Sequence, residues 1–177
     1  SVVARNREPG TGDRALALPT ELIGQEYYVL SWGEGLGFRH SEFVVVATED
    51  TTHVVADGFP FPGGPLDVML DRGEGVLVTS GFDIAGVRIV ADKKVVVANG
   101  NDCVDVGDDY CEHLYEIALP VERWENDYLA KSNRLVDLQR GDGFERNYYR
   151  VVIAQDDTNL WVNGTLAGSS RNAGDVL

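Results

Sequence analysis

Two cysteines and a cluster of carboxylates share one short stretch of the chain, and they are the side chains best suited to cross-linking or ion binding. Cys103 and Cys111 are separated by seven residues. In an exported protein such a pair can close a short disulfide loop, whereas in a reducing compartment both would be free thiols. A zinc site is the less favoured alternative, because Cys103, Cys111 and His113 lack a common zinc spacing and supply only three ligands.

Five carboxylates crowd the loop between and beside the two cysteines. They are Asp102, Asp105, Asp108, Asp109 and Glu112. Like charges this close repel one another unless a cation or water screens them, and calcium prefers oxygen ligands in flexible loops. The sequence therefore predicts a weak calcium site. The alternative is a solvated acidic loop, because the EF-hand spacing of carboxylates is missing.

Residue patterns for catalysis are missing elsewhere in the sequence. There is no Gly-x-Ser-x-Gly elbow, and the chain has only three histidines. The pairs Glu49-Asp50 and Asp156-Asp157 each follow a β-branched run and precede a threonine. This context favours turns in which the acidic side chain hydrogen-bonds the backbone of its own turn, and not a pair of glycosidase carboxylates. We expect a protein that is not an enzyme and that uses no cofactor, calcium aside.

The three tryptophans are the remaining candidates for ligand contact. Trp32, Trp124 and Trp161, together with seven tyrosines, can form an aromatic platform for glycans. Trp32 and Trp161 lie in strand-like runs, so packing into a hydrophobic core is the alternative for them.

The charge of the chain limits its partners. The 177 residues include 29 acidic and 15 basic side chains, which gives a formal net charge of −14. Such a surface repels phosphate backbones and anionic lipid, so we expect no nucleic-acid partner. No apolar run reaches the roughly 18 residues needed to cross a bilayer, so we expect no membrane insertion. The start at Ser1 indicates a processed or trimmed N-terminus.

Short runs of β-branched and aromatic residues fill most of the chain. Many are bounded by turn sequences such as Asp57-Gly58, Asn99-Gly100 and Asn163-Gly164. Strands of about five residues at this spacing are typical of a sandwich or barrel. The one candidate helix, residues 120–126, is at most two turns long. The sequence therefore predicts an all-β, sandwich-like fold.

The chain also repeats itself. The motif Leu-Pro-x-Glu, with Tyr six residues further on, begins at Leu18 and again at Leu119, an offset of 101 residues. The run Val44–Thr51 matches Val151–Thr158 at an offset of 107. Two matches in the same order indicate a tandem duplication of about 100 residues per copy.

The repeat divides the chain into three parts. Residues 1–17 are expected to be a tail or the remnant of a preceding segment. Residues 18–118 form a first β module, and residues 119–177 form a second, incomplete one. An incomplete module leaves an open strand edge, which we expect a strand from outside this sequence to fill.

Three segments together carry a family resemblance. In combination and in this order along the chain, Ser41–Thr52, Ile89–Cys103 and Cys111–Glu116 resemble the N-terminal domain of the IgG Fc-binding protein family. That domain occurs in mucin-like animal proteins and in large secreted proteins of bacteria. The resemblance covers nearly the whole chain.

The resemblance implies an extracellular β domain with a Cys103–Cys111 disulfide, in large adhesive or matrix-type proteins, and it implies no catalysis. We therefore interpret the chain as a non-enzymatic adhesion or assembly module of a larger secreted or cell-surface protein. Its partner would be a protein, a glycan or further copies of itself. The alternative function is a carbohydrate-binding module that uses the three tryptophans.

Overall fold

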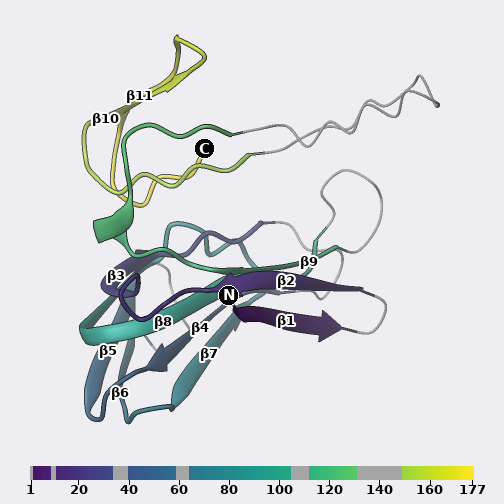
Figure 1. Cartoon of the computed structure of the whole chain (residues 1–177). Coiled ribbons are helices and arrows are strands. Elements are labelled where there is room, and N and C mark those ends of the chain that lie inside the picture. The colour runs from purple at the N-terminus through teal and green to yellow at the C-terminus, as the bar shows by residue number, and fades with distance from the viewer. Residues whose placement is uncertain (1, 9–10, 34–39, 59–63, 105–111, 131–148) are drawn as a thin grey trace.

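One strand of 17 residues runs through the middle of the molecule, and the main sheet is built on both of its edges (Figure 1). The computed structural model describes residues 2–8, 11–33, 40–58, 64–104, 112–130 and 149–177. The elements in chain order are β1 (Val2–Glu8), β2 (Thr11–Ala17), β3 (Gly24–Tyr28), β4 (Ser41–Ala47), β5 (Thr52–Asp57), β6 (Leu66–Leu70), β7 (Gly75–Ser80), β8 (Arg88–Val104), β9 (Glu112–Ile117), η1 (Val121–Arg123), β10 (Thr158–Val162) and β11 (Thr165–Arg171).

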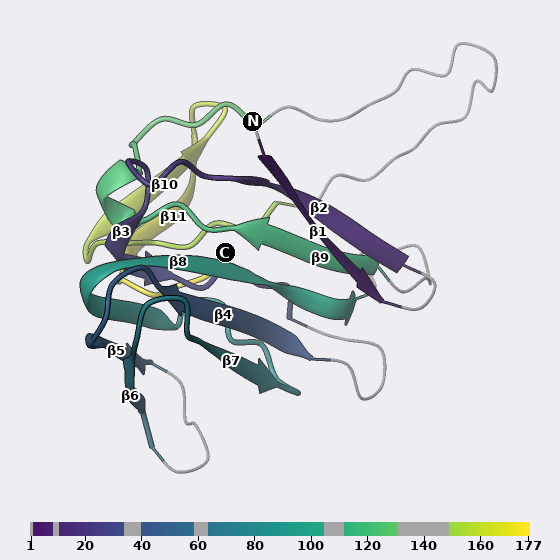
Figure 2. The same cartoon turned by 60° about the horizontal axis from the view of Figure 1, so that its bottom comes forward.

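The long strand β8 has two neighbours on each edge. β4 and β5 follow one another along one edge, both antiparallel to β8. β3 and β9 follow one another along the opposite edge, also antiparallel. β6 and β7 extend the sheet beyond β5 and β4. Figure 2 shows β8 curving along its length, so that its two halves belong to differently tilted parts of one sheet.

The sheet bends where residues 48–51 separate β4 from β5. Thr48 Oγ1 donates to Lys94 O (2.6 Å), and the His53 backbone N–H donates to Asp92 Oδ1 (2.8 Å). Lys93 Nζ donates to the Thr51 carbonyl at 3.0 Å. These side chains satisfy the backbone groups that lose their ladder partners at the bend, so the bend does not leave polar groups unpaired.

Buried and less buried side chains alternate along the strands, and the buried ones form the hydrophobic core. In β4, every second side chain is buried, from Ser41 through Phe43 and Val45 to Ala47. Successive side chains of a strand point to opposite faces, so the apolar run has one face in the core and one face half exposed. The core cluster also contains Tyr27, and β-branched or aliphatic side chains from β5 and β8.

The first seventeen residues contain a hairpin. β1 and β2 pair antiparallel, with Val2 opposite Ala17 and Glu8 opposite Thr11. β2 lies alongside β9, and Asp13 Oδ2 accepts a hydrogen bond from the Tyr115 backbone N–H at 3.0 Å. This segment, expected to be a tail or remnant, therefore extends the strand layer past β9.

Residues 149–177 form a smaller β arrangement above the main sheet (Figure 1). β10 and β11 pair as an antiparallel hairpin, and Val152 bridges to Val176. The expected helix at residues 120–126 is a single 3-10 turn, η1. No helix among the described residues is long and apolar enough to cross a bilayer.

Hydrogen bonds within residues 120–175 repeat hydrogen bonds within residues 19–74. In each pair, the bond from residues 19–74 comes before its counterpart. Two pairs lie around the Leu-Pro-x-Glu motif: Leu22 N to Pro19 O with Arg123 N to Pro120 O, and Gly24 N to Tyr27 Oη with Glu125 N to Tyr128 Oη. Three pairs lie around the second matching block: Thr52 Oγ1 to Glu49 O with Thr158 Oγ1 to Gln155 O, Arg72 N to Asp50 Oδ1 with Ala173 N to Asp156 Oδ1, and Ala47 N to Glu74 O with Ile153 N to Asp175 O.

These bonds change the alignment of the second matching block by one residue. Thr52, not Thr51, corresponds to Thr158, because Thr52 and Thr158 both donate to the carbonyl three residues earlier. The positive φ angles of Thr51 (54°) and Asp157 (58°) agree with an offset of 106 instead of 107. A slip of one residue would reverse the faces of every side chain in a strand. The fold is all-β as predicted, while its division into two modules stays a prediction.

The Tyr27 hydroxyl provides a test of the core. It accepts from the Gly24 N–H (2.8 Å) and donates to the Val95 carbonyl on β8 (2.7 Å), with no exposed surface. Tyr27→Phe leaves both backbone groups unpaired in the core, so we expect a loss of about 1–3 kcal/mol in the free energy of unfolding, measured by urea denaturation. The control is Tyr128→Phe, whose hydroxyl is exposed and which should change stability by less than about 0.5 kcal/mol. Equal effects of the two substitutions would contradict this account.

Candidate functional site

A cleft of about 320 Å³ lies where four parts of the chain meet, one of which is β2 with Asp13. Its floor comes from β8 and β9, and its walls come from the segment after β3 and from the segment before the bridge at Val152. The lining residues are Asp13, Leu30, Ser31, Trp32, Asn99, Gly100, Leu114, Tyr115, Glu116, Tyr149 and Arg150. Three aromatic rings and a few polar groups in a concave site are the usual composition of a binding site for a small ligand or a partner side chain.

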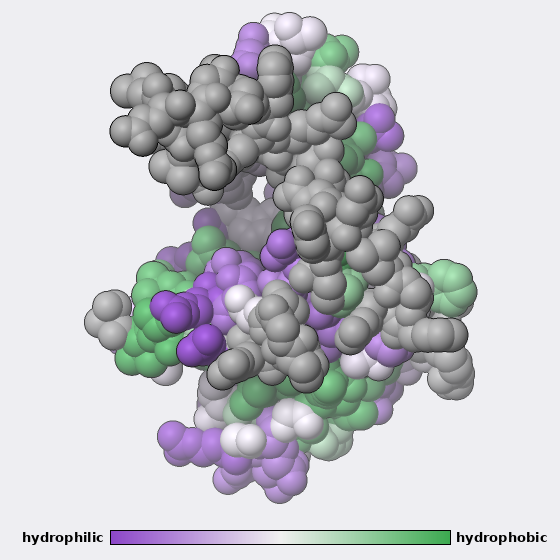
Figure 3. Space-filling view, turned by 90° about the vertical axis from the view of Figure 1, so that its right-hand side faces the viewer, coloured by the Kyte–Doolittle hydropathy of each residue, from purple (hydrophilic) through white to green (hydrophobic). Residues whose placement is uncertain are grey.

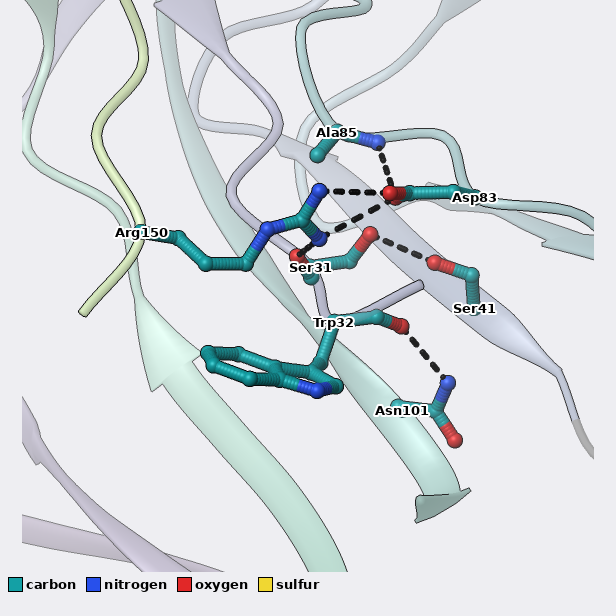
Figure 4. A network of polar contacts seen from close by, with 7 residues as sticks. All are labelled: Ser31, Trp32, Ser41, Asp83, Ala85, Asn101 and Arg150. Atoms are coloured by element: carbon teal, nitrogen blue, oxygen red, sulfur yellow. Dashed lines mark hydrogen bonds and ion pairs between the residues drawn. The ribbon is translucent and has the colours of Figure 1, made fainter. Parts of the chain in front are cut away.

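Arg150 holds one wall of the cleft to the main sheet (Figure 4). Its guanidinium donates through Nη2 to Asp83 Oδ2 at 2.5 Å and through Nη1 to the Ser31 carbonyl. The Arg150 Cζ atom also lies 5.6 Å from the centre of the Trp32 ring, within the range of a cation–π contact. Most of the Arg150 side chain is buried. One residue thus joins the last third of the chain to the first.

Trp32 is held in place through its backbone. Its carbonyl accepts a hydrogen bond from Asn101 Nδ2 at 2.9 Å, and the preceding Ser31 hydroxyl lies 2.5 Å from the Ser41 hydroxyl. Asn99 Oδ1 accepts from the Leu30 N–H at 2.9 Å. Among the described residues no strand pairs with residues 30–32, and the side-chain amides of Asn99 and Asn101 on β8 bond this backbone instead.

The floor of the cleft requires a glycine. A Cβ atom at Gly100 would lie 1.9 Å from the Leu114 carbonyl oxygen, so only glycine allows β9 to approach β8 this closely. The next two residues of β9, Tyr115 and Glu116, are then brought to the cleft lining.

Glu116 is one of the titratable groups that line the cleft. Desolvation raises the pKa of Glu116 above its usual value, and the negative charge of Asp13 raises it further, against the lowering effect of a hydrogen bond from the Ile117 backbone. Desolvation also raises the pKa of Tyr115, and the charge of Glu116 adds to this effect. A carboxyl with a raised pKa keeps its proton to a higher pH than an exposed carboxyl does, and in the protonated form it can donate a hydrogen bond to a ligand.

The structure brings only one of the three tryptophans to this site. Trp124 is half-buried, with its ring centre 6.1 Å from that of Tyr28 and its Nε1 donating to the Leu119 carbonyl (3.0 Å). Trp161 is exposed on β10. Only Trp32 lines the cleft, and a glycan contact through the tryptophans stays a prediction.

The cysteine loop lies largely outside the described residues. Cys103 is buried, and Asp102 Oδ1 accepts from the His40 N–H at 2.6 Å, while Glu112 is exposed. Cys111, Asp105, Asp108 and Asp109 fall in residues 105–111, which the structure does not describe. No group of three metal-binding side chains occurs in the described ranges. The disulfide and the calcium site stay predictions.

Sequence reasoning missed most of the cleft. Tyr149 and Arg150 lie about 118 residues from Trp32 in the chain, and nothing in the local sequence around them indicates the contact. Gly100 and Glu116 lie in segments that carry the family resemblance, and their local sequence does not indicate a site. The only available signal was the turn sequence Asn99-Gly100, which the structure shows inside a strand.

The fold is all-β, and the cleft is formed by tertiary contacts between its remote segments. Comparison with known proteins gives the family. The family model described as IgGFc binding protein matches residues 13–177, and the chain belongs to this family. The chain is also 30% identical over 189 residues to the IgGFc-binding protein of Homo sapiens, a match that covers 100% of the chain and 3% of the human protein. No solved structure matches.

The contact of Arg150 with Asp83 gives a second testable prediction. Arg150→Lys keeps the positive charge but loses the planar guanidinium and its stacking on Trp32. Its free energy of unfolding should therefore fall by most of the amount that Arg150→Ala costs. In a double-mutant cycle with Asp83→Asn, measured by urea denaturation, we expect a coupling energy of about 1 kcal/mol. Additive effects would show that the ion pair does not fasten the cleft wall.

Glu116 gives a prediction for pH. Its pKa is raised in the folded protein, so its contribution to stability is fully present below the unfolded pKa near 4.5 and is lost as the pH rises through the folded pKa. The side chain of Glu116→Gln stays neutral at every pH, so the variant should have a higher melting temperature than the wild type at pH 7. The difference in melting temperature should shrink as the pH falls toward 4. The exposed Glu21→Gln is the control. A variant no more stable than the wild type at pH 7 would contradict the raised pKa.

Proposed function

We propose that the chain is a non-catalytic protein-binding module of an extracellular protein, and that it holds its partner at the cleft around Trp32 and Arg150. Tryptophan, tyrosine and arginine are the side chains that dominate the energy of protein interfaces. The cleft combines Trp32 and Arg150 with Tyr115 and Tyr149 in one place, and this combination is the observation that carries the proposal.

The rigid support of the cleft favours a binding role. Arg150 and Asn101 hold the tryptophan before any partner arrives, so little side-chain entropy remains to be lost on association. Tyr149, by contrast, is exposed and presents its ring to solvent. Figure 3, which views the molecule from the right-hand side of Figure 1, shows hydrophobic patches interrupted by hydrophilic residues on the described surface. A small anchored contact fits such a surface better than a broad apolar interface.

The name of the human relative suggests the first partner to test, the Fc part of immunoglobulin G. The chain spans only 3% of that protein, so its partners are a proposal here. An extracellular location agrees with a partner of this kind. The net charge of −14 would steer a basic partner surface toward the chain and would make the association rate fall with added salt.

The test is surface plasmon resonance with the chain immobilised and Fc and Fab fragments in solution. We expect saturable binding of Fc and not of Fab, weakened about tenfold or more by Tyr149→Ala. Trp161→Ala is the matched control, because Trp161 is also an exposed aromatic residue but lies outside the cleft. Absence of Fc binding refutes Fc as the partner, and equal loss in both variants refutes the cleft as the contact.

A carbohydrate-binding role remains the second candidate, and the exposed ring of Trp161 on β10 is the observation that favours it. An isolated exposed tryptophan can stack on the apolar face of a sugar ring. Glycan-array binding that is lost in Trp161→Ala and kept in Tyr149→Ala would favour this function over protein binding.

A further inference from the structure

The cleft around Trp32 carries more negative than positive charge among the described residues. Asp13 and Glu116 line it as carboxylates, and Arg150 is the basic residue that lines it. The Arg150 guanidinium points toward Asp83 and pairs with that carboxylate, with Nη2 2.5 Å from Asp83 Oδ2 (Figure 4). Asp83 does not belong to the cleft lining, so it neutralises Arg150 from outside the cleft. The charges of Asp13 and Glu116 are left without compensation.

The two carboxylates have free capacity to accept hydrogen bonds. The ion pairs of the described residues include neither Asp13 nor Glu116. Asp13 is bonded by backbone groups, since Oδ1 accepts from the Arg14 N–H (2.7 Å) and Oδ2 from the Tyr115 N–H (3.0 Å). A carboxylate accepts about four hydrogen bonds, so Asp13 can take further donors. The raised pKa of Glu116, caused by desolvation and by the charge of Asp13, agrees with a carboxylate that no cation stabilises.

Aromatic rings line the same cleft as these carboxylates. Arg150 already lies over the Trp32 ring, so the rings of Tyr115 and Tyr149 are those left for a ligand. Tyr149 is 53% exposed, which leaves its ring open to contact. The face of an aromatic ring attracts a cation because of its quadrupole. Carboxylates and ring faces in one concave site therefore favour a cationic ligand over a neutral or anionic one.

We propose that the cleft binds an arginine side chain of the partner protein, with Asp13 and Glu116 as the acceptors and the ring of Tyr149 as the stacking surface. A guanidinium is planar, carries five N–H donors and stacks on aromatic rings, so it suits carboxylates and rings at once. A lysine ammonium is a compact, strongly hydrated point charge and lacks the stacking face. The proposal rests on the binding role of the cleft proposed above, and it adds the chemical group that the cleft recognises.

The probe for this site is N-acetyl-arginine amide, titrated into the isotope-labelled chain at neutral pH and low salt and followed by NMR. We expect saturable shifts of the backbone amides of Gly100, Tyr115 and Glu116, with a roughly millimolar dissociation constant. N-acetyl-citrulline amide has nearly the same shape without the charge, so it should bind about tenfold more weakly or not at all. Equal binding of the two amides, or shifts confined to residues outside the cleft, overturns the proposal. N-acetyl-lysine amide that binds as tightly as the arginine amide overturns the choice of arginine.

Two variants of equal charge separate the cleft from the overall negative charge of the chain. Glu116→Gln and Glu21→Gln each remove one carboxylate, but Glu21 is exposed and does not line the cleft. Glu116→Gln should weaken binding of the arginine amide about fivefold or more, whereas Glu21→Gln should leave the affinity unchanged. Glu116→Gln is expected to be the more stable protein at neutral pH, so its loss of binding cannot come from unfolding. Wild-type affinity in Glu116→Gln overturns the proposal.

Surface plasmon resonance with the Fc fragment separates this proposal from the protein-binding role itself. Fc binding that Tyr149→Ala weakens and Glu116→Gln leaves unchanged keeps the cleft as a protein contact and overturns the arginine contact. Arginine amide bound at the cleft without any Fc binding supports the arginine contact and refutes Fc as the partner. Fc binding that both variants weaken, and that excess arginine amide but not citrulline amide displaces, supports both proposals.

Discussion

The burial of β8 between two sets of strands is the constraint on which the rest of the structure depends. Every strand of the main sheet except β6 and β7 pairs with β8 directly, and those two pair with its neighbours. Because a single strand carries both halves of the sheet, the side chains at its bend must replace lost ladder bonds. Asp92 and Lys93 do so by bonding the turn between β4 and β5. Loss of β8 would expose both edges and most of the core at once.

The cleft follows from the same arrangement. β9 can lie against the second half of β8 only because Gly100 leaves room, and this places Tyr115 and Glu116 beside Trp32. Arg150 then closes the remaining side through Asp83 and the Ser31 carbonyl. The site is therefore formed by tertiary contacts between segments that are remote in sequence, with rigid strands beneath it.

The sequence was most informative where a strand has one buried face. β4, β5 and β7 have the alternating or β-branched runs that such strands require. Asn99-Gly100 was expected to bound a strand as a turn but lies inside β8, and only the pairing on both edges of β8 shows that the strand continues there. β1 and β2 contain too many charged residues to show a strand pattern. Arg150 was not predictable, since its partners are distant in the chain.

The most direct measurement of the account is hydrogen exchange of the chain alone, analysed by mass spectrometry segment by segment. The amides of residues 88–101 should exchange at the rate of global unfolding, because β8 has strands on both edges. The amides of residues 127–130 and 158–162 should exchange much faster, because residues 127–130 lie outside the strands and β10 pairs only with β11 among the described residues. Equal protection of these segments would contradict the claim that β8 alone organises the stable part of the fold.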